Sequence, residues 1–145
     1  IEETYQSGMS FLDVGTGTGI LALSAAKIQG ERKKEKGKIV GCDTDADSIT
    51  IAKENAEING VENVGFYVGS ISAETPEFDF VCANLTLDVI APLVALLTLK
   101  TRKILVLSGI LKEQENLIIR ELEKLAIDDF KITADGEWFA LIIKS

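Results

Sequence analysis

An aspartate stands directly before a turn that contains three closely spaced glycines. In the segment Phe11–Leu23, FLDVGTGTGILAL, Asp13 closes an apolar run, and Gly15, Gly17 and Gly19 follow at every second position. Glycine lets a backbone turn tightly and approach a ligand. The helix expected after the turn offers unpaired N–H groups and a partial positive charge. The segment therefore predicts a site for an anionic group or for the edge of a sugar.

The carboxylate of Asp13 restricts which ligand suits this turn. A dinucleotide-binding turn reads G-x-G-x-x-G/A, whereas here Ile20 stands at the sixth position counted from Gly15. Beside a pyrophosphate, the carboxylate would add repulsion in a partly desolvated site. It would instead attract a ligand that carries a sulfonium and an amino group, as S-adenosylmethionine does. We interpret the turn as a site for S-adenosylmethionine, with nicotinamide dinucleotide binding as the alternative.

Polar side chains also follow the later apolar runs. Asp43 ends the run IVGCD, where a carboxylate can accept hydrogen bonds from both hydroxyls of a ribose. Alternatively, Asp43 or Asp45 caps the next helix. Asn84 follows FDFVCA, where its amide either holds the ligand and a substrate amine or only forms a turn. Because ligands bind beyond the carboxyl ends of parallel strands, we expect Asp13, Asp43, Ser70 and Asn84 to lie together.

Strand-like apolar runs alternate with segments of helical spacing. We predict strands over Ser10–Val14, Lys38–Cys42, Asn63–Val68, Phe78–Ala83 and Lys103–Leu107, and helices over Thr18–Gly30, Asp45–Asn59, Leu87–Leu99 and Leu111–Ala126. The runs Phe130–Thr133 and Trp138–Lys144 flank Asp135-Gly136, which is a strong hairpin signal. The alternation predicts the α/β class, with three layers and a mostly parallel sheet of seven strands that ends in an antiparallel hairpin.

Several apolar side chains have expected packing roles. In the last helix we expect Leu117, Ile118, Leu122 and Leu125 to face inward. The segment Val89–Leu99 is apolar almost all round, which favours burial, with a homodimer contact or an additional domain as the alternative cover. We expect Trp138 and Phe139 to serve in packing and as an edge aromatic, and not as a stacking platform for a ligand.

Length and charge limit the class of protein. A chain of 145 residues with 46% hydrophobic residues suits one domain over residues 1–145. Ile1–Ser7 reads like the end of a helix stopped by Gly8, so we expect an N-terminal truncation. The net charge of −8 argues against direct nucleic-acid binding, and we expect the basic cluster Glu31–Lys38 to be a solvated loop.

The residue types exclude other kinds of site. The chain has no histidine, which excludes histidine-based triads and argues against a zinc site, so we predict no metal. Cys42 and Cys82 lie in apolar runs, which indicates buried thiols and a reducing, cytoplasmic location. Neither a signal peptide nor a membrane-spanning stretch is visible in the sequence.

Five sequence motifs resemble those of one enzyme family. They are DVGTGTGILALSAAK, IAKENAEING, VCANLTLDVIAPL, LVLSGILKEQEN and GEWFALII. Over about residues 10–144, the chain resembles the catalytic domain of the ribosomal protein L11 methyltransferases, which are class I S-adenosylmethionine-dependent enzymes. The resemblance implies a Rossmann-like fold and methylation of lysine or N-terminal amines of a protein, with a ribosomal protein as partner.

The resemblance also assigns roles to residues. It implies that S-adenosylmethionine, whose product is S-adenosylhomocysteine, binds to Asp13, Gly15, Thr16, Gly17, Asp43, Thr44, Ser70, Ile71 and Asn84. It implies that Asn84 and the carbonyl group of Leu85 orient the acceptor amine. Many methyltransferases carry an acidic residue where Ser70 stands, so adenine recognition is expected to rest on the backbone of Ser70 and Ile71.

Departures from the family leave alternatives open. The family carries an N-terminal domain that docks the ribosomal protein, and a Thr/His-bearing segment before the first strand. Neither is present in this sequence. We therefore keep two further interpretations, namely a related methyltransferase with another substrate and an inactive S-adenosylmethionine-binding module.

Overall fold

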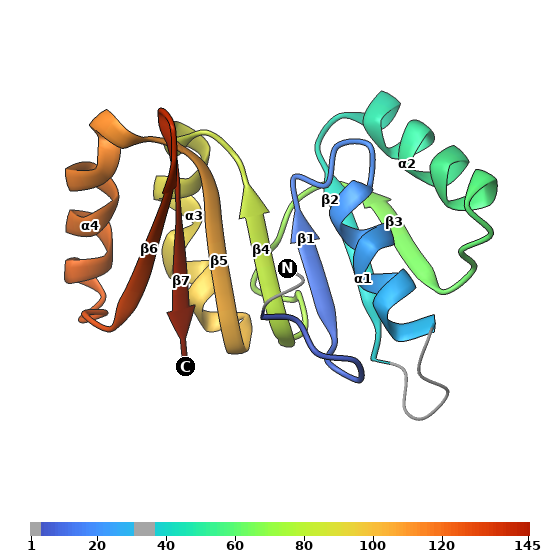
Figure 1. Ribbon diagram of the computed structural model, residues 1–145, viewed down its shortest axis with the longest axis horizontal. Coiled ribbons are helices and arrows are strands. Elements are labelled where there is room, and N and C mark those ends of the chain that lie inside the picture. Colours follow the sequence, from blue (N-terminus) through green and yellow to red (C-terminus); the bar gives the residue numbers. More distant parts are fainter. Residues whose placement is uncertain (1–3, 31–36) are drawn as a thin grey trace.

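A single sheet runs through the computed structural model, which describes residues 4–30 and 37–145. The elements are β1 (Phe11–Val14), α1 (Ile20–Gly30), β2 (Ile39–Asp43), α2 (Ala46–Ile58), β3 (Val64–Val68), β4 (Phe78–Asn84), α3 (Leu87–Leu99), β5 (Thr101–Leu111), a 3-10 turn (Lys112–Gln114), α4 (Glu115–Lys124), β6 (Phe130–Asp135) and β7 (Trp138–Lys144). Figure 1 shows the strands side by side with helices on both faces of the sheet.

The strand order confirms the predicted α/β architecture. The seven strands run in the order β3-β2-β1-β4-β5-β7-β6. β1 pairs in parallel with β2 and β4, whereas β7 pairs antiparallel with β5 and β6. The chain reverses its direction of winding between β1 and β4, which is where open α/β sheets bind ligands.

Alternate side chains of β1 belong to two separate hydrophobic cores, one on each face of the sheet. Leu12 and Val14 join the core beneath α3 and α4, whereas Phe11 joins the core beneath α1. α1 lies in front of the sheet and α3 behind it in the view of Figure 1. Because Asp13 alternates with Leu12 and Val14, it points to the same face as Phe11.

The predicted boundary between the fifth strand and the last helix is wrong. β5 continues to Leu111, where it pairs with Trp138, because β7 supplies a partner along its second edge. The α-helical part of the last helix begins only at Glu115. Of the residues expected to face inward, Ile118 and Leu122 are buried, but Leu117 and Leu125 are exposed. The buried apolar face of α4 is therefore narrower than predicted.

Two further segments differ from expectation. α3 is not buried all round, because Val89 and Leu99 are 41% and 68% exposed while Ile90 and Leu97 are fully buried. The described part of Ile1–Ser7 forms turns and irregular backbone instead of a helix end. It is held by Tyr5, whose ring packs edge-on against Phe11 and Phe80.

Some expectations fall outside the described residues. Most of the basic cluster Glu31–Lys38 and the first three residues lie there. Among the helices of residues 4–30 and 37–145, none combines the length and the apolar character that crossing a membrane requires.

Candidate functional site

The turn after β1 is tied to the neighbouring strand β2 through its backbone. The N–H groups of Gly15 and Thr16 both donate to the carbonyl oxygen of Cys42, at 2.8 Å. Gly15, Gly17 and Gly19 have φ of 76°, 56° and 85°, a left-handed backbone that favours glycine. α1 begins directly afterwards, so the turn leaves the first N–H groups of that helix at the carboxyl edge of the sheet.

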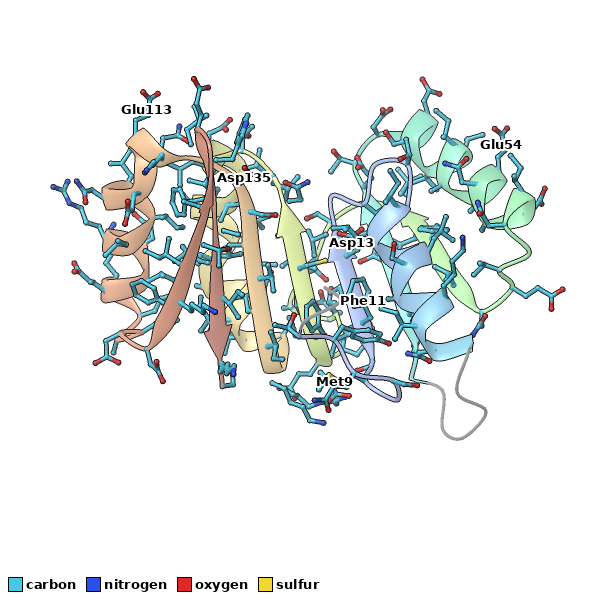
Figure 2. The ribbon with its side chains drawn as sticks, viewed as in Figure 1. Met9, Phe11, Asp13, Glu54, Glu113 and Asp135 are labelled. Atoms are coloured by element: carbon cyan, nitrogen blue, oxygen red, sulfur yellow. The ribbon has the colours of Figure 1, made fainter. Side chains whose placement is uncertain are left out.

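The carboxylate of Asp13 lies beneath this turn, buried within the fold. Asp13 is 1% exposed, and its Oδ2 accepts a hydrogen bond of 2.7 Å from the hydroxyl of Thr16. Its Oδ1 accepts one of 3.3 Å from the thiol of Cys82. Figure 2 shows Asp13 within the sheet, near β1 and β4. The charge therefore supports the turn through Thr16, and a direct contact with a ligand amine stays a prediction.

Burial of this carboxylate sets an expected pH dependence of stability. Burial raises the pKa of Asp13 above its usual value of 3.8, against the hydrogen bonds from Thr16 and Cys82. A raised pKa means that the contribution of Asp13 to stability is complete below the unfolded-state pKa and is lost as pH rises through the folded-state pKa. We expect Asp13→Asn, which stays neutral and can still pair with both neighbours, to unfold at a higher urea concentration than wild type at pH 7.

The same comparison at acidic pH provides the control. As the pH falls toward the unfolded-state pKa and Asp13 becomes protonated in the folded protein, the difference between the two midpoints should shrink. A difference of equal size at both pH values would contradict an ionised, desolvated Asp13.

A strand glycine beneath the turn makes room for Thr16. A Cβ on Gly41 would lie 2.7 Å from Thr16 Oγ1 and 2.8 Å from the ring of Phe66. We expect Gly41→Ala to lower the free energy of unfolding by about 1–3 kcal/mol, the usual range for overpacking. Gly65→Ala on β3 is the matched control, since its Cβ would meet only the carbonyl oxygen of Ile39, at 4.0 Å. Equal urea midpoints for the two variants would show that the space at Gly41 is not required.

Asp43 presents its carboxylate where β2 ends. Oδ2 accepts a hydrogen bond of 2.9 Å from the N–H of Gly17, and Oδ1 accepts one of 2.9 Å from the N–H of Asp45. The cap of α2 is Asp45, whose side chain accepts hydrogen bonds from Asp47 and Ser48. Capping therefore does not occupy Asp43, and each of its oxygens keeps a second acceptor position.

The loop after β3 is fixed beside Asp43. The N–H of Gly69 donates to the carbonyl oxygen of Asp43 at 2.8 Å, so Ser70 lies close to that strand end. Ser70 is exposed, whereas the side chain of Ile71 is 7% exposed and belongs to the core beneath α3. Ile71 can therefore face a ligand at this edge only through its backbone, because its side chain is buried. Thr44 is exposed next to Asp43.

Asn84 and Leu85 extend the site across the point where the winding reverses. Asn84 is the last residue of β4, and the N–H of Leu85 donates to the carbonyl oxygen of Ser108 at 3.1 Å. A Cβ on Gly15 would overlap the side chain of Leu85. The glycine turn and the end of β4 are therefore in direct contact, and the predicted residues lie along one edge of the sheet.

A cavity of about 630 Å³ opens beside Asn84 and Leu85. It lies between the ends of β4 and β5 and the β6–β7 hairpin, and its lining includes Ser108, Asp135 and Trp138. Asp135 and Trp138 are paired across the hairpin. Figure 2 shows Asp135 near the hairpin end, at the edge of the sheet to which the glycine turn belongs.

The contribution of the hairpin to this cavity was not predicted from the sequence. Phe139 is buried as expected, but Trp138 is 52% exposed and lines the cavity. The Asp-Gly signal at Asp135-Gly136 could have indicated the arrangement, because an antiparallel last strand brings its first residues to the carboxyl end of β5.

Within residues 4–30 and 37–145, no group of three or more His, Cys, Asp or Glu side chains could hold a metal ion.

Comparisons with known proteins identify the family of this chain. The family described as "Ribosomal protein L11 methyltransferase (PrmA)" matches residues 1–145. A ribosomal protein L11 methyltransferase of Nitratiruptor sp. is 34% identical over 148 residues, covering 100% of this chain and 49% of that protein. The one from Campylobacter lari is 37% identical over 145 residues, covering 98% and 49%. The chain therefore spans about half the length of the curated relatives it matches.

A solved structure extends the likeness to three dimensions. The crystal structure of a ribosomal protein L11 methylase from Lactobacillus delbrueckii subsp. bulgaricus superposes with a TM-score of 0.87 at 27% identity. The match covers 98% of this chain and 72% of that one. The Rossmann-like arrangement predicted from the motifs is thereby confirmed.

Proposed function

Because the chain belongs to the ribosomal protein L11 methyltransferase family, we propose that it transfers methyl groups from S-adenosylmethionine to amines of a ribosomal protein. The acceptors are lysine side chains or an N-terminal amine. A ribosomal substrate implies a cytoplasmic location. The contact between Leu85 and Gly15 carries the proposal, because it joins a turn suited to the methyl donor to a cavity suited to the acceptor.

The residues at the glycine turn fit S-adenosylmethionine. A Cβ on Gly17 would meet nothing within 4 Å, so the backbone there faces open space that a ligand can fill. Asp43, whose Oδ2 is bonded to Gly17, has a free acceptor position on each oxygen for the two ribose hydroxyls. The exposed Ser70 and the backbone of Ile71 would hold the adenine, and Thr16 and Thr44 would line the site.

Asn84 and Leu85 would orient the nucleophile. When bound, S-adenosylmethionine supplies an electrophilic methyl group on a sulfonium. The Asn84 amide oxygen and the Leu85 carbonyl oxygen accept hydrogen bonds from the acceptor nitrogen and aim its lone pair. A lysine must first lose a proton, which desolvation against the apolar lining of the cavity favours and the nearby carboxylate of Asp135 opposes. Positive charge passes from donor to acceptor, so alignment and exclusion of water suffice without a strong base.

The hairpin supplies a recognition surface for a cationic side chain. The exposed ring of Trp138 offers a face for a cation–π contact with an incoming ammonium group. The carboxylate of Asp135 lines the same cavity and adds a favourable charge. Both features favour a protein amine over a nucleic acid, and the net charge of −8 agrees with this preference.

A methyl-transfer assay tests the proposal. The complete protein that carries this chain is incubated with ribosomal protein L11 and S-adenosylmethionine carrying a radiolabelled methyl group. We expect labelled protein, and mass spectrometry should place the label on amines. Calorimetry should detect S-adenosylhomocysteine binding and no binding of NAD.

Each other result rejects part of the proposal. Binding of S-adenosylhomocysteine with label on another acceptor would reject the ribosomal substrate. Binding without any transfer would favour an inactive binding module. A preference for NAD would reject the methyltransferase assignment as a whole.

A further inference from the structure

A β-bulge interrupts β5 beside the cavity. Between Leu107 and Ile110, β5 advances three residues while β7 advances two, from Leu141 to Phe139. The extra residue falls at Ser108 and Gly109, and Gly109 has a φ of 83°. Bulges of this kind redirect the backbone, and glycine at such a φ is the residue that avoids strain.

The bulge brings Gly109 against the end of β4. A Cβ on Gly109 would lie 2.7 Å from the carbonyl oxygen of Leu85 and 2.8 Å from Oδ1 of Asn84. It would also lie 3.1 Å from the N–H nitrogen of Leu85. These first two oxygens are the atoms that would orient the acceptor amine, so a side chain here would displace both of them.

Leu85 is consequently confined between two glycines. On one side, its side chain occupies the space that a Cβ of Gly15 would need, and on the other its carbonyl oxygen occupies the space that a Cβ of Gly109 would need. Gly15 belongs to the donor turn, whereas Gly109 lines the acceptor cavity.

We propose that Gly109 is a positioning residue for methyl transfer, because its missing side chain lets the Asn84 amide and the Leu85 carbonyl face the acceptor nitrogen. The inference rests on the proposed function and deepens it. Gly109 contributes no reacting atom. It acts through Asn84 and Leu85, so its replacement should impair alignment more than donor binding.

Gly109→Ala in the complete protein tests this role. We expect kcat for methylation of ribosomal protein L11 to fall by about 10- to 100-fold, as displacements near 1 Å do at reacting centres. Calorimetry should show an S-adenosylhomocysteine affinity within about threefold of wild type, because the new Cβ meets Leu85 and Asn84 and not Asp43 or the glycine turn. Gly60→Ala is the control, since Gly60 has a similar φ of 65° and its Cβ would meet nothing within 4 Å. It should keep the wild-type kcat.

A double substitution separates positioning from general destabilisation. Asn84→Ala removes one of the two displaced oxygens, so Gly109→Ala should lower kcat by a smaller factor in that background than in wild type. An equal factor in both backgrounds, an unchanged kcat in Gly109→Ala, or a parallel loss of S-adenosylhomocysteine binding would overturn the inference.

Two further results remain, namely failure of a variant to fold and absence of activity in the wild-type protein. If Gly109→Ala does not fold, Gly109→Asn takes its place, because asparagine tolerates left-handed backbone and carries the same Cβ. Failure of both variants to fold would make the requirement purely structural and reject the inference. A wild-type protein without transferase activity would instead reject the proposed function on which the inference rests.

Discussion

Replacing Asn84 by alanine is expected to lower kcat for methyl transfer by about 10²- to 10³-fold, the range found when one preorganised polar group is removed from an active site. Asn84 ends β4, is exposed at the cavity and lies beside the carbonyl of Leu85. Without its amide oxygen, the acceptor nitrogen keeps only one of two hydrogen-bond acceptors and loses its alignment.

Loss of acceptor alignment in Asn84→Ala is recognised by a fall in kcat without a matching fall in donor affinity. S-adenosylhomocysteine binding, measured by calorimetry, should change much less than kcat, because Asp43 and the glycine turn are untouched. Asn116→Ala on the exposed surface of α4 is the control and should leave both quantities unchanged. A parallel loss of kcat and affinity would assign Asn84 to donor binding alone.

Asp43→Ala is expected to weaken S-adenosylhomocysteine binding by about 100-fold, since two hydrogen bonds to a charged group contribute about 1.5 kcal/mol each. The substitution also removes the acceptor for the N–H of Gly17, so the turn loses a tie to β2. Isothermal titration calorimetry at constant ionic strength measures the change.

Asp45→Ala is a matched control two residues away. It removes the cap of α2 and should lower the free energy of unfolding by about 1 kcal/mol. Its affinity for S-adenosylhomocysteine should stay near that of wild type. If Asp45→Ala weakened binding as much as Asp43→Ala, the ribose would not depend on Asp43 in particular.

The sequence predicted the parts of the site that depend on local chemistry. The spacing of Gly15, Gly17 and Gly19 requires a tight turn, and the strand end at Asp43 follows from an apolar run that stops at a carboxylate. The mostly parallel sheet and the edge shared by these residues followed from the alternation of elements, whereas the order of the strands was not predicted. Which aspartate caps α2 did not follow, because Asp43 and Asp45 are equivalent as residue types.

The missed features depend on contacts between distant segments. The length of β5 is set by its pairing with β7, which no periodicity within Lys103–Leu107 reveals. The role of Gly109 depends on atoms of Leu85 and Asn84 that lie one strand away. Exposure of Leu117 likewise depends on where α4 meets the core, since its apolar character alone favoured burial.

The packing of Leu85 against Gly15 has a thermodynamic consequence. An occupant that shifts the backbone of Gly15 would press on the side chain of Leu85 and, on the proposed function, would also move the carbonyl that orients the acceptor. Linkage then requires reciprocity: the factor by which donor occupancy changes acceptor affinity is the factor by which the acceptor changes donor affinity. On the proposed function, exchange of the spent donor for a fresh one would be coupled, through Leu85, to the departure of the methylated protein.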